Sequence, residues 1–349
     1  MKMFDIRKMK QQFLVAIIAA LSLSGCDSVI YDDQGDCSVN YRVSFRYVRN
    51  IVGADAFGPQ VADVNLYVYD KSGNLALKKT ETRELSVDNG FYMDIDLQPG
   101  TYDMIAWCEG RTSNPETIRF AIGSGEMKTA LNASLTLGGI SPDLYSDKDI
   151  VPLFHGIATD VVLPDTYGTI DLDPIMLTKD TNRISVILQN INGDPVDRKD
   201  YLFRIEGSNS ELDHTNIVTG TPHFFYHPWS VEEIAADFEY EENESKSRAS
   251  ITVPNGVMAQ LTTGRLMADM EQKLTVSRSD TGEPILSIPL IRYLLLVKGK
   301  YDGIDTDQDY LDCNDTYSLV FFVDGNMKWM KSRIFINNWR VVPPQDEEL

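Results

Sequence analysis

The alternation of apolar and polar residues is the feature that most limits what this chain can fold into. In residues 41–47, tyrosine, valine, phenylalanine and tyrosine are separated by single polar residues, which is the period of a β-strand with one buried face. The same period returns at 64–69 and 91–97, and helical periodicity is rare along the chain. Short strands of this kind predict an all-β fold built from β-sandwiches.

Turn residues divide the first half of the chain into strands. Residues 70–74 read Asp-Lys-Ser-Gly-Asn, and this turn predicts a hairpin between 64–69 and 75–79. Residues 98–100 read Gln-Pro-Gly, where proline fixes φ and glycine accepts a positive φ, so the preceding strand ends there. The chain then returns in the apolar run 102–108.

The second half of the chain carries its own series of strands. They are predicted at 171–177, 183–188, 201–206, 250–253, 272–277, 317–323 and 333–337. Without its first 25 residues the chain has 324 residues, which is more than one core usually supports. We therefore expect an N-terminal β-sandwich at 37–175 and a C-terminal β-sandwich at 176–349.

Helix is expected only in short pieces. Ser230 and Glu233 fit a capping box, which predicts one or two helical turns over 230–238. A second short helix is expected at 147–154. The polar stretches 239–248 and 299–308 are expected to be surface loops.

The N-terminus predicts export and lipid attachment. Four basic residues precede an apolar run that ends at Ser24, as in a signal peptide. A helix of about 12 residues spans about 18 Å, too short for a hydrocarbon core of about 30 Å. Residues 23–26 read Leu-Ser-Gly-Cys and resemble the bacterial lipobox, in which the thiol receives diacylglycerol. We therefore assign 1–25 to a lipoprotein signal peptide, Cys26 to lipidation and 26–36 to a tether. The alternative is a secretory signal that ends near an ordinary cysteine.

The net charge excludes one class of partner. Removal of the signal peptide takes away four basic residues and one acidic residue, which moves the formal charge from −20 to −23. A field of that sign repels nucleic acid and anionic head groups. We expect no nucleic-acid partner, and we expect membrane attachment through lipid.

Three cysteines remain once Cys26 is acylated: Cys37, Cys108 and Cys313. An exported chain meets an oxidising compartment, and an odd number of thiols allows at most one bridge within the chain. Cys37 and Cys108 both lie beside strand-like runs of the first half, so we favour a disulfide between them.

The chain shows no pattern typical of a catalytic or metal site. Among its four histidines, His223 and His227 are four residues apart, but prolines flank them and the glutamate of an HExxH zinc site is absent. In the acidic segment from Asp302 to Asp312, a calcium loop that starts at Asp305 would need glycine at its sixth position and glutamate at its twelfth. Tyr310 and Thr316 stand there instead. A solvated loop is therefore favoured over a calcium site. We expect a protein without catalytic activity, cofactor or metal.

Several aromatic residues stand near polar turns, namely Trp107, Tyr226, Trp229 and Trp339. Aromatic platforms of this kind stack on sugar rings in carbohydrate-binding proteins, although such residues more often fill a sandwich core. A surface glycan-binding lipoprotein is therefore an alternative interpretation.

Several motifs together resemble one known family. They are Cys37 before a strand, VADVNLYVYDKSGNL at 61–75, LQPGTYDMIAWC at 97–108, LFHG at 153–156, QDYLD at 308–312 and INNW at 336–339. With the lipobox, their order and spacing resemble the FimB/Mfa-type fimbrial anchor subunits of Bacteroidetes, which are fimbrillin-associated lipoproteins. The resemblance extends over nearly the whole chain after the signal peptide.

The resemblance implies two tandem transthyretin-like Greek-key β-sandwich domains and a structural role at the base of a fimbrium. The lipid, diacylglycerol or palmitate, would hold the polymer at the outer membrane and limit its length, with fimbrial shaft or accessory subunits as partners. Shaft subunits of this kind are thought to polymerise after cleavage at an arginine. In an anchor, cleavage at Arg46 or Arg49 would release the lipid, so an uncleaved first strand is implied.

Two features depart from the family pattern. Cys313 follows Leu-Asp where relatives often carry a basic residue, which indicates an unpaired thiol. The tail after Trp339 contains Pro343 and Pro344, which remove two amide donors, so it is a poor donor strand. Docking through a sandwich face or edge is expected instead. A fimbrial tip or accessory adhesin remains a further alternative to the anchor.

Overall fold

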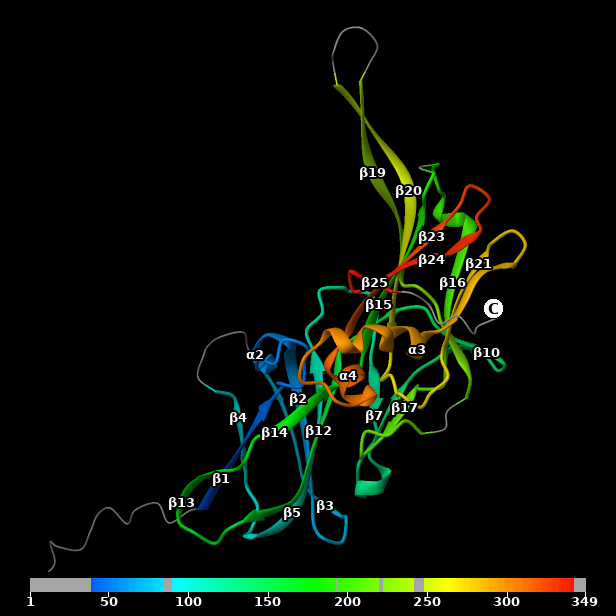
Figure 1. Ribbon diagram of the computed structural model, residues 1–349. Helices are drawn as coiled ribbons and strands as arrows, with labels where there is room; N and C mark the ends of the chain where they lie inside the picture. Colours follow the sequence, from blue (N-terminus) through cyan, green and yellow to red (C-terminus); the bar gives the residue numbers. More distant parts are fainter. Residues whose placement is uncertain (1–38, 84–89, 193, 220–221, 242–247, 342–349) are drawn as a thin grey trace, which may run out of the picture.

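The computed structural model describes residues 39–83, 90–192, 194–219, 222–241 and 248–341, with the backbone alone for 236–241, 248–254, 332 and 333. Most of this chain is strand, arranged in several sheets, and helix is confined to short pieces (Figure 1). The predicted all-β fold is therefore confirmed.

One sheet of eight strands belongs to the first half of the chain, in the order β13-β1-β14-β12-β5-β2-β3, with β4 paired to β1. Its strands are β1 (Val39–Arg46), β2 (Val61–Tyr69), β3 (Leu75–Thr82), β4 (Tyr92–Ile95), β5 (Gly100–Gly110), β12 (Leu153–Leu163), β13 (Gly168–Asp171) and β14 (Ile175–Lys179). The short helix α2 (Phe57–Gln60) precedes β2. The sheet folds over on itself, so β1 and β4 face β2 and β5 across a shared core.

Two sheets of six strands form most of the second unit. The first runs in the order β22-β21-β16-β18-β10-β9, and the second in the order β19-β20-β15-β23-β24-β25. The strands of the first are β9 (Gly138–Ile140), β10 (Asp143–Ser146), β16 (Tyr201–Gly207), β18 (Phe224–Tyr226), β21 (Lys273–Arg278) and β22 (Pro284–Pro289). Those of the second are β15 (Asn182–Asn190), β19 (Ser230–Glu241), β20 (Arg248–Thr263), β23 (Thr316–Val323), β24 (Trp329–Ile336) and β25 (Trp339–Val341).

Smaller elements complete the second unit. Three strands pair in the order β17-β8-β7, and β11 pairs with β6. They are β6 (Thr117–Ile118), β7 (Phe120–Ile122), β8 (Asn132–Leu135), β11 (Asp149–Ile150) and β17 (Glu211–Asp213). The helices are α3 (Leu290–Leu294) and α4 (Asp307–Cys313), with 3-10 turns η1 (Lys128–Ala130), η2 (Arg198–Asp200) and η3 (Leu295–Lys300).

Strands β2 and β5 contribute side chains to two hydrophobic cores. The first core lies within the eight-stranded sheet, and the second core lies in the second unit. In β2, Leu66 packs into the first core and Tyr67 into the second. In β5, Ala106 packs into the first core and Trp107 into the second. Successive side chains point to opposite faces of a strand, so this part of the sheet is buried on both faces. The two units therefore share a packed layer.

The chain also passes between the two units more than once. β14, which begins at the predicted join near residue 175, pairs with β1 and β12 of the first sheet. Conversely, part of the first half of the chain belongs to the second unit. Phe120, Leu135 and Ile150 pack into the second core. The units thus interlock along the sequence.

Both predicted short helices are wrong. Residues 230–238 lie in β19, whose twelve residues pair with β20, and the Ser230 hydroxyl donates to Glu232. Residues 147–154 hold β11 and the start of β12. Pairing of β19 with β20 outweighs the local capping signal at Ser230. Conversely, the loop predicted at 299–308 leads into α4, where the Thr306 hydroxyl accepts from the Asp309 amide as an N-cap.

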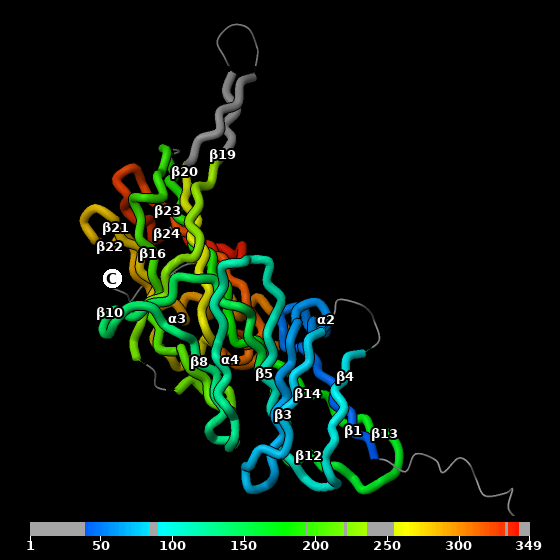
Figure 2. The backbone as a smooth tube through the Cα atoms, turned by 180° about the vertical axis from the view of Figure 1, so that it is seen from behind, coloured from blue at the N-terminus to red at the C-terminus, as the bar shows by residue number. Residues whose placement is uncertain are grey.

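The two ends of the molecule differ. β1 begins at the end where the turns before β5 and β13 lie, and the hairpin of β19 and β20 projects at the other end (Figures 1 and 2). The chain that leads from the predicted lipid therefore enters the fold far from this hairpin.

Candidate tether strand and interdomain junction

The strand β1 is the first described element after the predicted tether, and it is paired on both sides. Residues Val39 to Arg42 pair in parallel with β13, Phe45 and Arg46 pair in parallel with β14, and Tyr41 to Ser44 pair with β4 in the antiparallel sense. A strand bonded along both edges cannot separate without breaking two ladders of main-chain hydrogen bonds.

The inward side chains of β1 fix the strand in the first core. Tyr41, Val43 and Phe45 are buried, as is Tyr47 just after the strand. Burial of an apolar side chain such as Val43 or Phe45 contributes about 1.5–3 kcal/mol. The Tyr41 hydroxyl donates to the carbonyl oxygen of Pro164 at 2.7 Å. The Tyr47 ring meets Phe154 edge to face, with centroids 5.1 Å apart. The alternation that predicted this strand therefore marks its core face.

Just after β1, Arg49 reaches the second unit. One of its Nη atoms lies 2.5 Å from Asp309 and 3.2 Å from Asp312, both on α4. The Thr306 hydroxyl donates to Asp309, and this bond together with Arg49 holds the pKa of Asp309 below its usual range. The end of the tether strand is thus ion-paired to the other sandwich.

Asp312 is the centre of this junction. Its side chain is only 2% exposed, and Arg265 binds both of its oxygens at 3.0 and 2.8 Å. Gln308 donates a further hydrogen bond at 2.8 Å. A buried carboxylate is tolerated when it is paired and hydrogen-bonded in this way. We call Arg49, Asp312, Arg265 and Asp180 the junction cluster.

Asp180, which lies between β14 and β15, is fully buried. Asn216 donates to one of its oxygens at 2.8 Å, and Nε of Arg265 lies 3.8 Å away. Burial outweighs these favourable contacts and raises the pKa of Asp180 to about 7. Its protonation state therefore changes near neutral pH.

The motif LFHG at 153–156 lies on β12, between the two cores. The His155 ring packs 4.5 Å from Trp107, and its Nε2 contacts the carbonyl oxygen of His214 at 3.1 Å. Burial lowers the pKa of His155 to about 4, so the ring is neutral at physiological pH. A Cβ at Gly156 would lie 2.6 Å from Ile175, so only glycine fits beside β14.

The predicted lipid and disulfide residues are placed only in part. Cys26 and Cys37 lie outside the described residues. Cys108 is a free, fully buried cysteine, and burial raises the pKa of its thiol. The Cys37–Cys108 bridge stays a prediction, because Cys37 is not among the described residues. Cys313 is a free cysteine on α4.

The predicted calcium alternative finds no support among the described residues, where no three acidic, histidine or cysteine side chains gather as metal ligands. Asp307 pairs with Lys298, and Asp309 and Asp312 pair with arginines. His223 and His227 flank the short strand β18.

Two of the four aromatic residues singled out for sugar binding are core residues. Trp107 and Tyr226 are fully buried. Trp229 is half-buried with Arg183 over its ring, and Trp339 is 44% exposed with Lys300 over its ring. Sequence reasoning missed the junction cluster, because its four members are distant in sequence.

No helix in the described part of the chain is long and apolar enough to cross a membrane.

Two interlocked units of β-sheet, entered through a doubly paired first strand, define this chain as an all-β protein. The chain belongs to the family of fimbrillin-A associated anchor proteins Mfa1 and Mfa2, whose family model matches residues 34–343. The predicted resemblance is confirmed, and family membership supports a role as a fimbrial subunit at the cell surface, in association with other fimbrial subunits.

Solved structures share this fold. A candidate adhesin from Bacteroides thetaiotaomicron is 29% identical with a TM-score of 0.68, covering 89% of this chain and 99% of that chain. A candidate polysaccharide-binding protein from the same organism is 24% identical with a TM-score of 0.71, covering 88% and 99%. The fimbrial anchor protein Mfa2 from Porphyromonas gingivalis is 18% identical with a TM-score of 0.59, also covering 88% and 99%. The last two show the fold alone. No curated protein matches the chain.

Proposed function

We propose that this protein anchors a fimbrium to the outer membrane through lipid on Cys26, with a structural and non-catalytic role. The observation that carries the proposal is the position of β1, which follows the tether directly and is bonded along both edges. A pull on the lipid is then resisted by main-chain ladders and by four buried side chains.

The junction cluster connects the tether strand to the second sandwich, so a pull on the lipid is also resisted there. Arg49 follows β1 by only a few residues and pairs with α4, and the two sandwiches also share the buried layer of β2 and β5. Large apolar interfaces keep domains rigid with respect to each other. Force applied to the polymer side is thus passed to the tether without a flexible joint between them.

An anchor of this design requires a continuous chain from the lipid to the body. Arg46 is exposed at the end of β1, and Arg49 is engaged with Asp309 and Asp312. Cleavage after either arginine would separate Cys26 from the sandwiches. We therefore propose that β1 remains uncleaved in the mature protein.

The fimbrial partner would dock on the second sandwich, at the end away from the start of β1 (Figure 1). A subunit held by lipid cannot move outward with the polymer, so its incorporation would also end growth and limit fimbrial length.

A comparison of wild type with Cys26→Ala in the native cell tests this function. Fimbriae are followed with a surface antibody in washed cells and in culture supernatant. The proposal predicts fimbriae that are shed or abnormally long in the variant. Fimbriae that stay attached with unchanged length would contradict it, and a loss of adhesion without shedding would point to a tip or accessory adhesin.

A further inference from the structure

The outer face of the sheet β22-β21-β16-β18-β10-β9 carries side chains that neither core uses. Because Ile205 and Tyr226 point into the second core, their neighbours on the same strands point outward. Tyr145 on β10 lies opposite Phe225 on β18, and Phe225 lies opposite Glu206 on β16. These three outward residues stand side by side across neighbouring strands.

Four rings form a platform on this face, which we call the aromatic platform: Tyr145, His223, Phe225 and His227. The centroid of Phe225 lies 5.1 Å from His223 and 6.4 Å from His227, which lies 6.0 Å from Tyr145. Burial holds the pKa of His227 below its ordinary value, so that ring stays uncharged at physiological pH.

Two features hold this platform in place. The Arg204 guanidinium lies over the Phe225 ring, 4.9 Å from its centroid. A Cβ at Gly138 would lie 3.0 Å from the Tyr145 ring, so the glycine of β9 lets that ring pack closely against the hairpin. Tyr145 is nevertheless 36% exposed, which leaves part of it open to a ligand.

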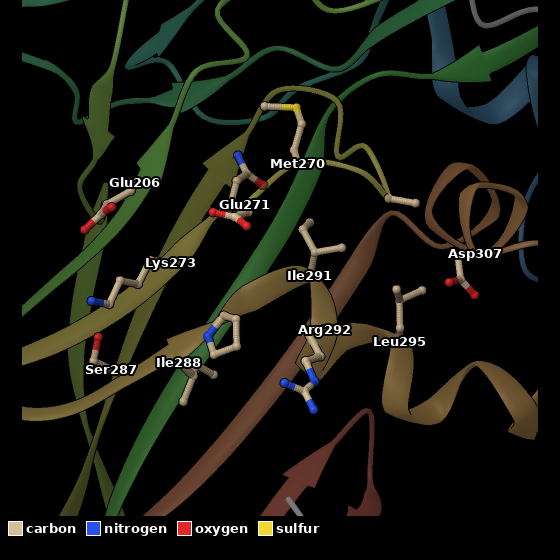
Figure 3. A pocket seen from close by; sticks show the side chains of 13 residues that line it. Glu206, Met270, Glu271, Lys273, Ser287, Ile288, Ile291, Arg292, Leu295 and Asp307 are labelled. Carbon is tan, nitrogen blue, oxygen red and sulfur yellow. The ribbon is translucent and has the colours of Figure 1, made fainter. Parts of the chain in front are cut away.

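A hollow of about 840 Å³ adjoins the platform. Glu206, Lys273 and Ser287 are among the polar residues that line it from the sheet, and Ile291 and Leu295 line it from α3 and η3 (Figure 3). This volume lies within the range of sites for small ligands. Glu206 connects the two features, because its carboxylate lies 3.7 Å from Nε2 of His223.

Gln272 lines the same hollow and lacks a hydrogen-bond partner. It is 2% exposed, and neither its amide nitrogen nor its amide oxygen is bonded. An unpaired buried polar group costs free energy, because it has lost its hydrogen bonds to water. A ligand that offers both a donor and an acceptor would remove this cost after a small rotation of the side chain toward the hollow.

The chemistry of this face favours one class of ligand. Sugar rings combine apolar C–H faces, which stack on aromatic rings, with hydroxyls that both donate and accept. The hollow carries the carboxylates of Glu206, Glu271 and Asp307 beside Lys273 and Arg292, and the whole chain is strongly acidic. Anionic glycans would therefore be repelled.

We propose that this face binds a neutral oligosaccharide, with a sugar ring on Tyr145 and Phe225 and neighbouring hydroxyls on Glu206 and Gln272. The binding activity is separate from anchoring, because the platform lies on the second sandwich and the tether strand on the first. It gives the base of a fimbrium contact with surface polysaccharide.

The test uses the full-length chain purified in detergent. Its probes are neutral gluco-, manno- and galacto-oligosaccharides printed beside sialylated and sulfated glycans, followed by calorimetry with the strongest neutral binder. Tyr145→Ala and Glu206→Ala should each weaken binding about tenfold or more. Tyr167→Ala is the matched control, because Tyr167 is an exposed tyrosine of the first sandwich, 81% accessible. Gln272→Leu removes the unpaired amide and should weaken binding without lowering thermal stability.

Three results would overturn the proposal. The first is no binding to any neutral glycan at roughly millimolar concentration. The second is binding that Tyr145→Ala and Glu206→Ala leave unchanged while both variants remain folded by circular dichroism. The third is loss, in the same variants, of binding to purified fimbrial subunits instead of glycans, which would make this face a protein interface.

Discussion

Arg49 and Asp312 lie 3.2 Å apart, although 263 positions separate them in the sequence, and their ion pair joins the end of the tether strand to the second sandwich. Asp312 is shared with Arg265, so one buried carboxylate holds two cations. Within the junction cluster, substitution of Asp312 is therefore expected to lower the free energy of unfolding most.

Asp312→Asn should lower the free energy of unfolding by about 2–4 kcal/mol, because it leaves Arg265 buried without its main counter-charge. Urea unfolding followed by tryptophan fluorescence measures this change. Asp309→Asn is the matched control on the same helix, since Asp309 is 42% exposed and its loss should cost less than about 1 kcal/mol. Equal effects of the two substitutions would contradict the assigned roles.

Asp180→Asn should flatten the pH dependence of stability. Burial raises the pKa of Asp180 from 3.8 to about 7 in the folded chain. Between these pH values the carboxyl of Asp180 holds a proton in the folded state that it has lost in the unfolded chain. The contribution of Asp180 to the free energy of unfolding therefore falls as pH rises from about 4 to about 7. The uncharged asparagine still accepts from Asn216 and lacks this dependence. Unfolding midpoints in urea at about pH 5 and about pH 8 measure the difference. The same decline in variant and wild type would show that Asp180 does not titrate in this window.

Gly156→Ala should destabilise the first sandwich. The new Cβ would lie 2.6 Å from Ile175 and 2.9 Å from the Met176 carbonyl oxygen, which forces β12 and β14 apart. Overpacking of this kind costs about 1–3 kcal/mol. Gly58→Ala is the control, because a Cβ there meets nothing within 4 Å. Thermal unfolding of both variants measures the effect, and unchanged stability of Gly156→Ala would show that the two strands separate easily.

Cys108 should resist thiol reagents in the folded protein and react once the chain is unfolded without reductant. Its thiol is fully buried, and burial raises its pKa, so the reactive thiolate is disfavoured. Maleimide labelling followed by peptide mass spectrometry distinguishes the states. A Cys108 that labels only after reduction would show that it forms a disulfide, and a cross-linked peptide with Cys37 would identify the bridge that the sequence suggested.

Local sequence patterns predicted the strands well where burial follows a simple period. The turn after β2 formed as expected, because the Asp70 carboxylate accepts from the amides of Ser72 and Asn74, and Gly73 takes a φ of +80°. The capping box at Ser230 failed, because β20 offers β19 a full ladder of hydrogen bonds that no local signal reports.

The junction could not be predicted from local patterns. The aspartates of α4 look like a solvated acidic loop when only their neighbours in sequence are considered. Their partners Arg49 and Arg265 lie far away along the chain, and only the packing of the two sandwiches brings them together. The aromatic platform is similar, because Tyr145 and Phe225 meet through strand pairing across 80 residues.

Anchoring requires that the lipid and the folded body belong to one unbroken chain through β1. The intact mass of the protein extracted from the native outer membrane, together with its N-terminal peptide, shows whether they do. We expect a chain that begins at acylated Cys26 and contains Arg46 and Arg49 uncut. A mature chain that begins after either arginine, without lipid, would rule out anchoring through β1.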